Sequence, residues 1–304
     1  MSTNFAIIII GDEILSGKRV DKHLPKAIEL LTERGLRLDR AEYVGDDPER
    51  ITATLKRAFE SGDVVFSTGG IGATPDDHTR QCAARALGVS LELHPQAEAL
   101  IRQRMQDTAA EQGVPYEADR PDNIHRLNMG MFPSGCDIIP NPYNKIPGFS
   151  CYVDRVGVQV KQGPRDWLCQ TAGAAASLGG SDPHAVGERG GIHFLPGFPV
   201  MAWPMMASVL DTVYHEHINK TQNQEKSVIV FGAMEAALTP LMERIEREHA
   251  GIKVFSLPSV NHPEYGRHIE LGVKGATVGV EGAYQAMLAG LVEVGAKLGP
   301  ELVR

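Results

Sequence analysis

Strand-like and helix-like segments alternate three times in the first part of the chain. Apolar runs predict strands at residues 5–11 and 63–70, and alternation of apolar and polar residues predicts a strand at 36–45. Helices are predicted at 22–34, 47–62 and 76–88. Strands that alternate with helices in this way are joined by right-handed crossovers into a parallel sheet covered on both faces. The chain is therefore expected to have an α/β fold with a three-layer, mostly parallel sheet.

The carboxy-terminal part follows a different order. After a polar linker at residues 219–226, the pattern becomes strand, helix, strand, strand, helix. This order predicts a small C-terminal α+β domain at residues 225–304. The larger α/β domain is expected to occupy residues 1–220.

Residues 151–191 fit neither pattern. They are dense in Gly and Ala and show no sustained periodicity, although a compact domain rarely contains so long a structureless loop. Two explanations remain open: an atypical, lineage-specific insertion, or a segment translated from a shifted reading frame. Under both explanations, residues 160–190 are expected to be poorly ordered.

An acidic pair follows each of the first three predicted strands. The pairs are Asp12–Glu13, Asp46–Asp47 and Asp76–Asp77, and the third follows a glycine-rich loop with Gly69, Gly70 and Gly72. Because ligands of open parallel sheets bind beyond the carboxyl ends of the strands, these groups are expected at one edge.

Glycine-rich backbone before a helix binds anions, whereas carboxylates repel them. A divalent cation reconciles the two, since Mg²⁺ binds one or two carboxylates together with phosphate oxygens. The predicted ligand is therefore a phosphate or pyrophosphate that arrives with a divalent metal.

Each of these signals also has a purely structural interpretation. Asp47 is a good cap for the helix that follows it, and either Asp76 or Asp77 is expected to cap the third helix. Asp12–Glu13 can be a polar turn, and a bare GGxG can be a turn without a ligand. Only the repetition after three successive strands favours a binding site.

The composition narrows the possible partners. The net charge is −8 and no Lys/Arg run occurs, so direct nucleic-acid binding lacks its usual footprint. The start does not resemble a signal peptide, and no apolar stretch approaches the ~20 residues of a membrane span. The cysteines show neither disulfide-framework nor zinc spacing: Cys82, Cys136, Cys151 and Cys169. A cytoplasmic protein with reduced thiols is expected.

Several stretches together resemble the molybdopterin-binding domain family of molybdenum-cofactor biosynthesis proteins. They are GDEILSGKRVD, VGDDPERI, FSTGGIGATPDDHT, and NPYNKIPGF with FLPGFP. The branch that they resemble most is the amino-terminal part of competence/damage-inducible protein A. The resemblance runs from residue 5 through nearly the whole chain, with residues 151–191 as a gap.

The resemblance implies the same two-part fold and an edge that binds a phosphate-bearing pterin, such as molybdopterin, or a nucleotide. Mg²⁺, Mn²⁺ or Co²⁺ is the implied cofactor, and self-association as a dimer or trimer is the implied assembly. By motif, catalytic positions fall on Asp77, Asp46 and Asp47, and metal-binding positions on Asp77, Asp46 and Asp76. The implied ligand-binding positions are Gly69, Gly70, Gly72, Thr74, Asp12, Glu13, Asn141 and Lys145.

Two positions near this motif set are doubtful. Lys145 can equally be a solvated lysine, and His23, which stands where many relatives have amides, is expected to be solvated or capping rather than a metal ligand.

Two functions remain open from the sequence. One is a metal-dependent nucleotide pyrophosphatase, similar to an ADP-ribose pyrophosphatase, or a nucleotidyltransferase. The other is a non-catalytic protein that binds molybdopterin or a nucleotide in molybdenum-cofactor handling or regulation. Turnover of pyrophosphate-bridged nucleotides with a divalent metal distinguishes the two.

Overall fold

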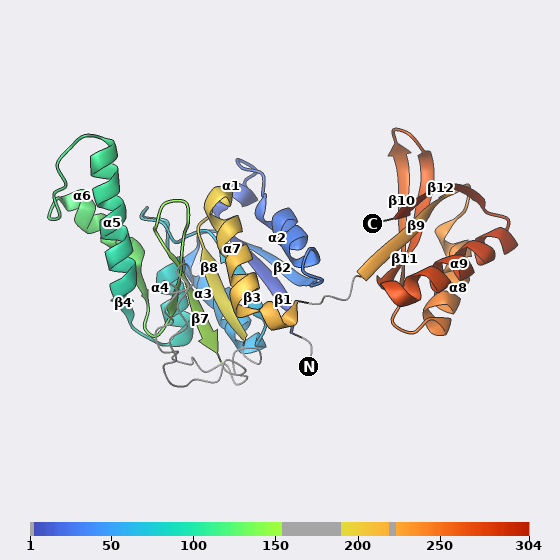
Figure 1. The fold of residues 1–304 in the computed structure, drawn as a ribbon, viewed down its shortest axis with the longest axis horizontal. Helices are drawn as coiled ribbons and strands as arrows, with labels where there is room; N and C mark the ends of the chain where they lie inside the picture. The colour runs from blue at the N-terminus through green and yellow to red at the C-terminus, as the bar shows by residue number, and fades with distance from the viewer. Residues whose placement is uncertain (1–2, 154–189, 219–222, 304) are drawn as a thin grey trace, which may run out of the picture. The chain divides into compact units, whose positions relative to one another are not determined.

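The structure is a computed structural model that describes residues 3–153, 190–218 and 223–303 (Figure 1). The chain divides into two compact units, Met1–Ile218 and Asn219–Arg304. Each unit has its own hydrophobic core and is described by itself below.

A six-stranded sheet forms the centre of the first unit, with the strand order β2-β1-β3-β8-β7-β6. Its strands are β1 (Phe5–Ile10), β2 (Leu38–Val44), β3 (Val64–Thr68), β6 (Asp137–Ile139), β7 (Gly148–Val153) and β8 (Gly190–Leu195). Strands β2, β1, β3 and β8 are parallel, whereas β7 runs antiparallel to both β8 and β6. The predicted mostly parallel sheet is confirmed.

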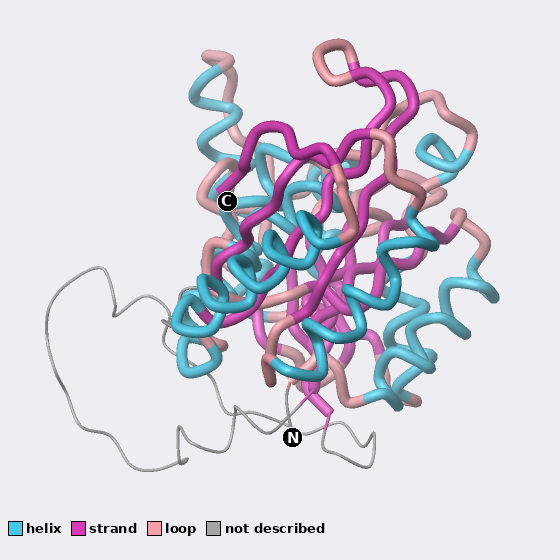
Figure 2. Tube along the Cα trace, turned by 90° about the vertical axis from the view of Figure 1, so that its right-hand side faces the viewer, coloured by secondary structure: helices cyan, strands magenta, loops and turns pink. Residues whose placement is uncertain are grey.

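Helices cover both faces of this sheet and make it three-layered. Apolar residues of α3 (Pro48–Ser61) and α4 (Thr79–Leu87) pack on one face, and those of α2 (His23–Thr32) and α7 (Pro199–Val213) pack on the other. Figure 2 shows the helices in cyan and the strands in magenta along the Cα trace. All six residues of β1 are buried, as expected for a strand covered on both faces.

Further helices and strands complete the first unit. They are α1 (Asp12–Leu15), β4 (Leu91–Leu93), α5 (Pro95–Glu111), α6 (Pro121–Arg126), the short 3-10 helices η1 (Leu127–Gly130) and η4 (His215–His217), and β5 (Met131–Pro133). Strands β4 and β5 pair with each other in a two-stranded sheet.

Both ends of the atypical segment belong to the central sheet. Cys151–Val153 lie in β7 and Gly190–Gly191 in β8, and Val153 pairs directly with Gly190. Gly190 packs so closely on Gly62 that a Cβ atom would overlap its backbone. The expectation of poor order at residues 160–190 falls on residues 160–189, which lie outside the described residues, and on Gly190, which is part of β8.

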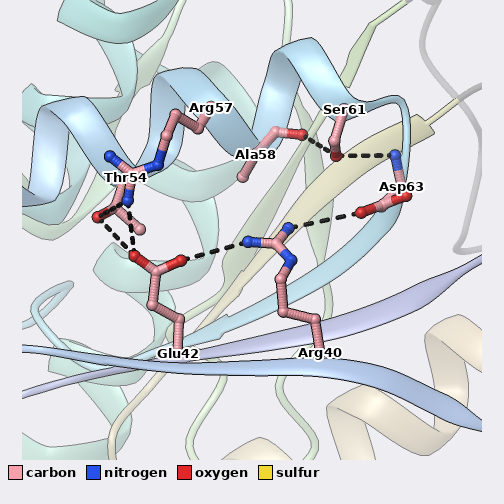
Figure 3. A network of polar contacts seen from close by, with 7 residues as sticks. All are labelled: Arg40, Glu42, Thr54, Arg57, Ala58, Ser61 and Asp63. Atoms are coloured by element: carbon pink, nitrogen blue, oxygen red, sulfur yellow. Dashed lines mark hydrogen bonds and ion pairs between the residues drawn. The ribbon is translucent and has the colours of Figure 1, made fainter.

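A polar network fastens α3 to the edge strand β2 (Figure 3). Glu42 on β2 accepts hydrogen bonds from Thr54 Oγ1 at 3.0 Å and Arg57 Nη2 at 2.7 Å, both on α3. Arg40 joins Glu42, at 3.2 Å, to Asp63 at the start of β3, at 3.5 Å. The network fixes the direction in which the chain leaves β2 and enters α3.

The second unit is an antiparallel sheet with two helices. Its elements are β9 (Asn223–Phe231), α8 (Glu235–Glu248), β10 (Lys253–His262), β11 (Gly266–Ala276), α9 (Thr277–Glu293) and β12 (Lys297–Val303), in the strand order β10-β11-β9-β12. The predicted α+β class is confirmed. Strand β12 was not predicted, because α9 ends at Glu293 and Gly295, at φ 71°, turns the chain back.

The structure also describes three of the four cysteines and the length and apolarity of the helices. Cys82, Cys136 and Cys151 are free and buried, and burial raises the pKa of Cys136 to about 12, so these thiols are poor nucleophiles. In the parts of the chain that the structure describes, no helix has the length and apolarity needed to cross a membrane.

Candidate functional site

A cavity of about 810 Å³ lies at the carboxyl edge of the four parallel strands. The segments after β1, β2, β3 and β8 all contribute to its lining, and the segment before the antiparallel strand β7 enters from the same edge. The cavity therefore stands where the topology of an open parallel sheet places ligands.

Most of the predicted site residues line this cavity, and three do not. Those that line it are Glu13, Asp46, Gly69, Gly70, Gly72, Thr74, Asp76, Asp77 and Asn141. Asp12, Asp47 and Lys145 do not line it. The structure thus brings together side chains from the ends of three successive strands, together with the glycine loop.

The glycine loop after β3 cannot be built with larger residues. Gly69 has φ 100° and Gly70 has φ 68°, a backbone region that side chains strongly disfavour. A Cβ atom on Gly69 would overlap the carbonyl oxygen of Ile10, and one on Gly70 would overlap the Thr79 hydroxyl. The loop therefore lies pressed between the end of β1 and the start of α4.

Thr79 at the start of α4 fixes the direction of the loop peptides. Its hydroxyl donates to the carbonyl of Gly69 at 3.1 Å, and its amide donates to the carbonyl of Gly70 at 3.0 Å. All described peptides are trans, so the N–H of the next residue points away from each bound carbonyl. The amides of residues 70–73 have no acceptor among the described residues. They form a concave donor site suited to an anion.

Asp46 is held next to other carboxylates. The Asp12 amide donates to Asp46 Oδ2 at 2.8 Å, and the Asp46 amide donates to Asp12 Oδ1 at 3.2 Å. Partial burial raises the pKa of Asp46, and the neighbouring negative charges of Asp12, Glu13 and Asp76 add to this effect. This crowding of negative charge is energetically unfavourable, and a bound cation would relieve it.

Asp77 closes the turn that follows the glycines. Its Oδ2 accepts from the Thr74 amide at 2.8 Å and from Thr74 Oγ1 at 2.6 Å. The nearby Thr74 side chain also lowers the pKa of Asp76. The expectation that Asp76 or Asp77 caps the third helix is wrong: His78 occupies the N-cap position, and no side chain caps α4.

The three predicted residues outside the cavity have other partners. Asp47 caps α3, and its Oδ1 accepts from the Arg50 amide at 2.8 Å. Lys145 does not line the cavity; it is exposed, as the solvated alternative expected, and pairs with Asp107 on α5 at 2.6 Å. Asp12 Oδ1 accepts a hydrogen bond from the Asp46 amide and so helps to orient Asp46.

Asn141 lines the cavity as predicted, but its described hydrogen bonds are local. Its amide group donates to Asn144 Oδ1 at 2.8 Å and to the Ile146 carbonyl at 2.9 Å, while its Oδ1 accepts from the Tyr143 amide at 3.0 Å. Asn141 therefore shapes the turn that enters β7.

Sequence reasoning missed several lining residues. Phe198 follows β8 and is 55% exposed at the cavity, and Arg19 and Lys22 add positive charge from the segment before α2. The expectation of a solvated or capping His23 is wrong: it is 5% exposed, and its Nε2 bonds to the Gly197 carbonyl at 3.1 Å. The proximity of FLPGFP to a strand end was the available signal for Phe198.

The donor set suits a hard divalent cation that also binds a ligand. In the described chain, no group of three or more His, Cys, Asp or Glu side chains is placed to hold a metal by itself. Mg²⁺ requires only one or two carboxylates when phosphate oxygens and water complete its shell. The crowded carboxylate of Asp46 and the exposed carboxylate of Asp76 fit that requirement.

Comparison with known proteins gives a family match over most of the chain. A family described as a probable molybdopterin binding domain matches residues 6–216. A CinA-like protein from Citrifermentans bemidjiense is 30% identical over 78% of this chain and 47% of its own length. A protein from Thermoplasma volcanium is 27% identical over 83% of this chain and 79% of its own length. The chain spans about half or less of the CinA-like relatives that it matches.

Solved structures are also similar to this chain. The protein CinA of unknown function from Thermoplasma acidophilum covers 71% of this chain and 100% of its own, with 24% identity and a TM-score of 0.48. The molybdopterin biosynthesis enzyme MoaB from Thermus thermophilus covers 71% of this chain and 94% of its own, with 18% identity and a TM-score of 0.38.

Proposed function

Because the chain belongs to the molybdopterin-binding domain family, we propose that its cavity binds a phosphate-bearing pterin or nucleotide. We further propose that it cleaves or transfers at a pyrophosphate with a divalent metal, as an ADP-ribose pyrophosphatase does. One observation carries this proposal: the cavity joins the free amides of the glycine loop to the carboxylates of Asp46 and Asp76.

Each part of the cavity has a role in this proposal. The amides of residues 70–73 hold a phosphate oxygen, while Asp46 and Asp76 hold the metal. A bound divalent ion neutralises phosphate oxygens and lowers the pKa of bound water. Phe198 offers a flat apolar surface to the pterin or adenine ring.

The test is hydrolysis of ADP-ribose, ATP and flavin adenine dinucleotide, each with Mg²⁺, Mn²⁺ or Co²⁺ and without metal. Asp46→Asn and Asp76→Asn are each expected to lower kcat/KM about 100-fold or more. Asp47→Ser is the matched control, because serine also caps a helix and Asp47 does not line the cavity. Full activity of Asp46→Asn, or an equal loss in Asp47→Ser, contradicts this site.

A second function has one observation in its favour. The Asp77 carboxylate is already bonded to Thr74 twice, and no preformed cluster of three metal ligands exists in the described residues. Both facts suit a non-catalytic protein that binds molybdopterin or a nucleotide. Metal-independent binding of a nucleotide or pterin, without turnover of any of the three substrates, supports this alternative.

A further inference from the structure

Arg80 lies buried directly behind the glycine loop. It stands in the first turn of α4 and is only 3% exposed. Its Nη1 donates to the carbonyl of Ile71 at 2.5 Å. Burial lowers the pKa of Arg80 to about 10, so that the guanidinium group remains charged at neutral pH.

This buried charge has no ion-pair partner in the described residues. Asp77 is the neighbouring negative charge, but its carboxylate is hydrogen-bonded to Thr74 and not to Arg80. The Nε atom of Arg80 is buried without a hydrogen-bond partner. An unpaired buried charge is costly, and proteins seldom retain one without a counter-charge.

The bond from Arg80 also determines which way the loop faces. The Ile71 carbonyl points back to the guanidinium group, and the peptide that follows is trans. The N–H of Gly72 therefore points away from Arg80. Together with the two carbonyls held by Thr79, this turns three successive amides in the same sense.

A second group in the cavity also lacks a partner. Thr68, the last residue of β3, is 1% exposed and lines the cavity, and its Oγ1 has no hydrogen-bond partner. A buried hydroxyl without a partner costs stability that a bound ligand can restore. It lies beside the amide row, at the residue before Gly69.

We infer that Arg80 is a positioning residue that makes the glycine loop selective for an anionic group, the phosphate or pyrophosphate of the ligand. It acts in two ways: it turns the Gly72 amide outward, and it supplies positive charge behind the amide row. The ligand oxygens then provide the missing counter-charge. The inference rests on the proposed function only in taking the ligand to carry phosphate.

Binding without metal tests this inference. Titration calorimetry with inorganic pyrophosphate, and separately with adenosine as a neutral probe, is applied to the full chain and to Arg80→Met, Arg80→Lys and Arg85→Met. Arg85→Met removes an exposed arginine from the same helix and is the matched control. Arg80→Met is expected to weaken pyrophosphate binding about tenfold or more. Arg80→Lys and Arg85→Met should change it little, and adenosine binding should not change.

The pH dependence of pyrophosphate binding by Arg80→Lys provides a test that remains usable if Arg80→Met folds poorly. A buried lysine loses its proton at a lower pH than arginine does. The pyrophosphate affinity of Arg80→Lys relative to the unmodified chain should therefore fall between pH 7 and pH 10. A constant ratio, or unchanged pyrophosphate affinity in folded Arg80→Met, overturns the inference. Absence of nucleotide turnover, with these binding results intact, overturns only the proposed pyrophosphatase.

Discussion

Asp46 and Asp47 are adjacent in the sequence but have different roles in the structure. Asp46 lines the cavity beside other carboxylates, whereas Asp47 caps α3. The difference follows from the backbone at Asp47, which is extended and forms the N-cap of α3. At the scale of single residues, the candidate site therefore depends on which of two identical side chains turns inward.

Asp46→Asn is expected to raise the melting temperature near neutral pH. The pKa of Asp46 is raised in the folded chain, so its contribution to stability is present below the unfolded pKa and is lost as pH rises through the folded pKa. Asparagine avoids that loss and still accepts from the Asp12 amide. The gain should disappear in acid, where both side chains are neutral. Thermal unfolding from pH 3 to pH 8 checks this, and an equal gain at every pH would contradict it.

Gly69→Ala is expected to cost about 2–5 kcal/mol, because it adds left-handed strain and overlap with the Ile10 carbonyl. Gly113→Ala is the matched control, since Gly113 has φ 68° and open space around it. It should cost only about 1–2 kcal/mol from backbone strain. Chemical denaturation measures both values. Equal losses would show that the close approach at Gly69 is not what restricts this position.

Among the elements, strand β2 and helix α3 depend on polar contacts as well as on apolar packing. The outer strand of the sheet carries Glu42, which binds Thr54 and Arg57 on the helix. Thr54 is only 4% exposed, so its hydroxyl has little access to water if Glu42 is removed. The pair of elements thereby holds the loop that carries Asp46.

Glu42→Ala is expected to lower the free energy of unfolding by about 1–2 kcal/mol, because the Thr54 hydroxyl is left without an acceptor. Glu60→Ala is the control, because Glu60 is an exposed carboxylate on α3 outside the network, and it should change stability by less than about 0.5 kcal/mol. Urea denaturation at pH 7 measures both. A control loss as large as that of Glu42→Ala would show that loss of a carboxylate in this region, and not loss of the network, explains the effect.

The elements that the sequence predicted well are those with a long local pattern. The six buried residues of β1 and the amphipathic face of α3 are visible in short windows. Strands β4 and β5 have three residues each, too few to show a period. Strand β12 was not predicted, because where it begins depends on the turn at Gly295.

The candidate site was predictable in its place but not in its details. Acidic residues after strands indicated the edge of the sheet at which the cavity lies. The pairing of Lys145 with Asp107 joins residues 38 positions apart, and the burial of His23 depends on a contact with Gly197. Such contacts are set by the tertiary arrangement, which no local pattern contains.

At the scale of the whole molecule, stability is divided between separate cores. Two apolar clusters enclose the central sheet of the first unit, and a third lies within the second unit. All the residues that line the candidate site belong to the first unit. Ligand binding is therefore expected to stabilise that unit directly.

Leu271→Ala is expected to destabilise only the second unit. Leu271 is fully buried in the third cluster, and its truncation should cost about 2–5 kcal/mol. Calorimetry should show one transition at lower temperature and the other unchanged, with pyrophosphate affinity preserved. Leu210→Ala, equally buried in the first unit, is the reciprocal control. A single transition that shifts in both variants would contradict independent unfolding.

The direct pairing of Val153 with Gly190 places the two ends of the intervening chain side by side. These ends lie at the opposite limit of β7 and β8 from the ligand cavity, which the other ends of the two strands border. An affinity tag or a fluorescent reporter inserted between them would thus be attached at the edge of the sheet opposite the candidate site.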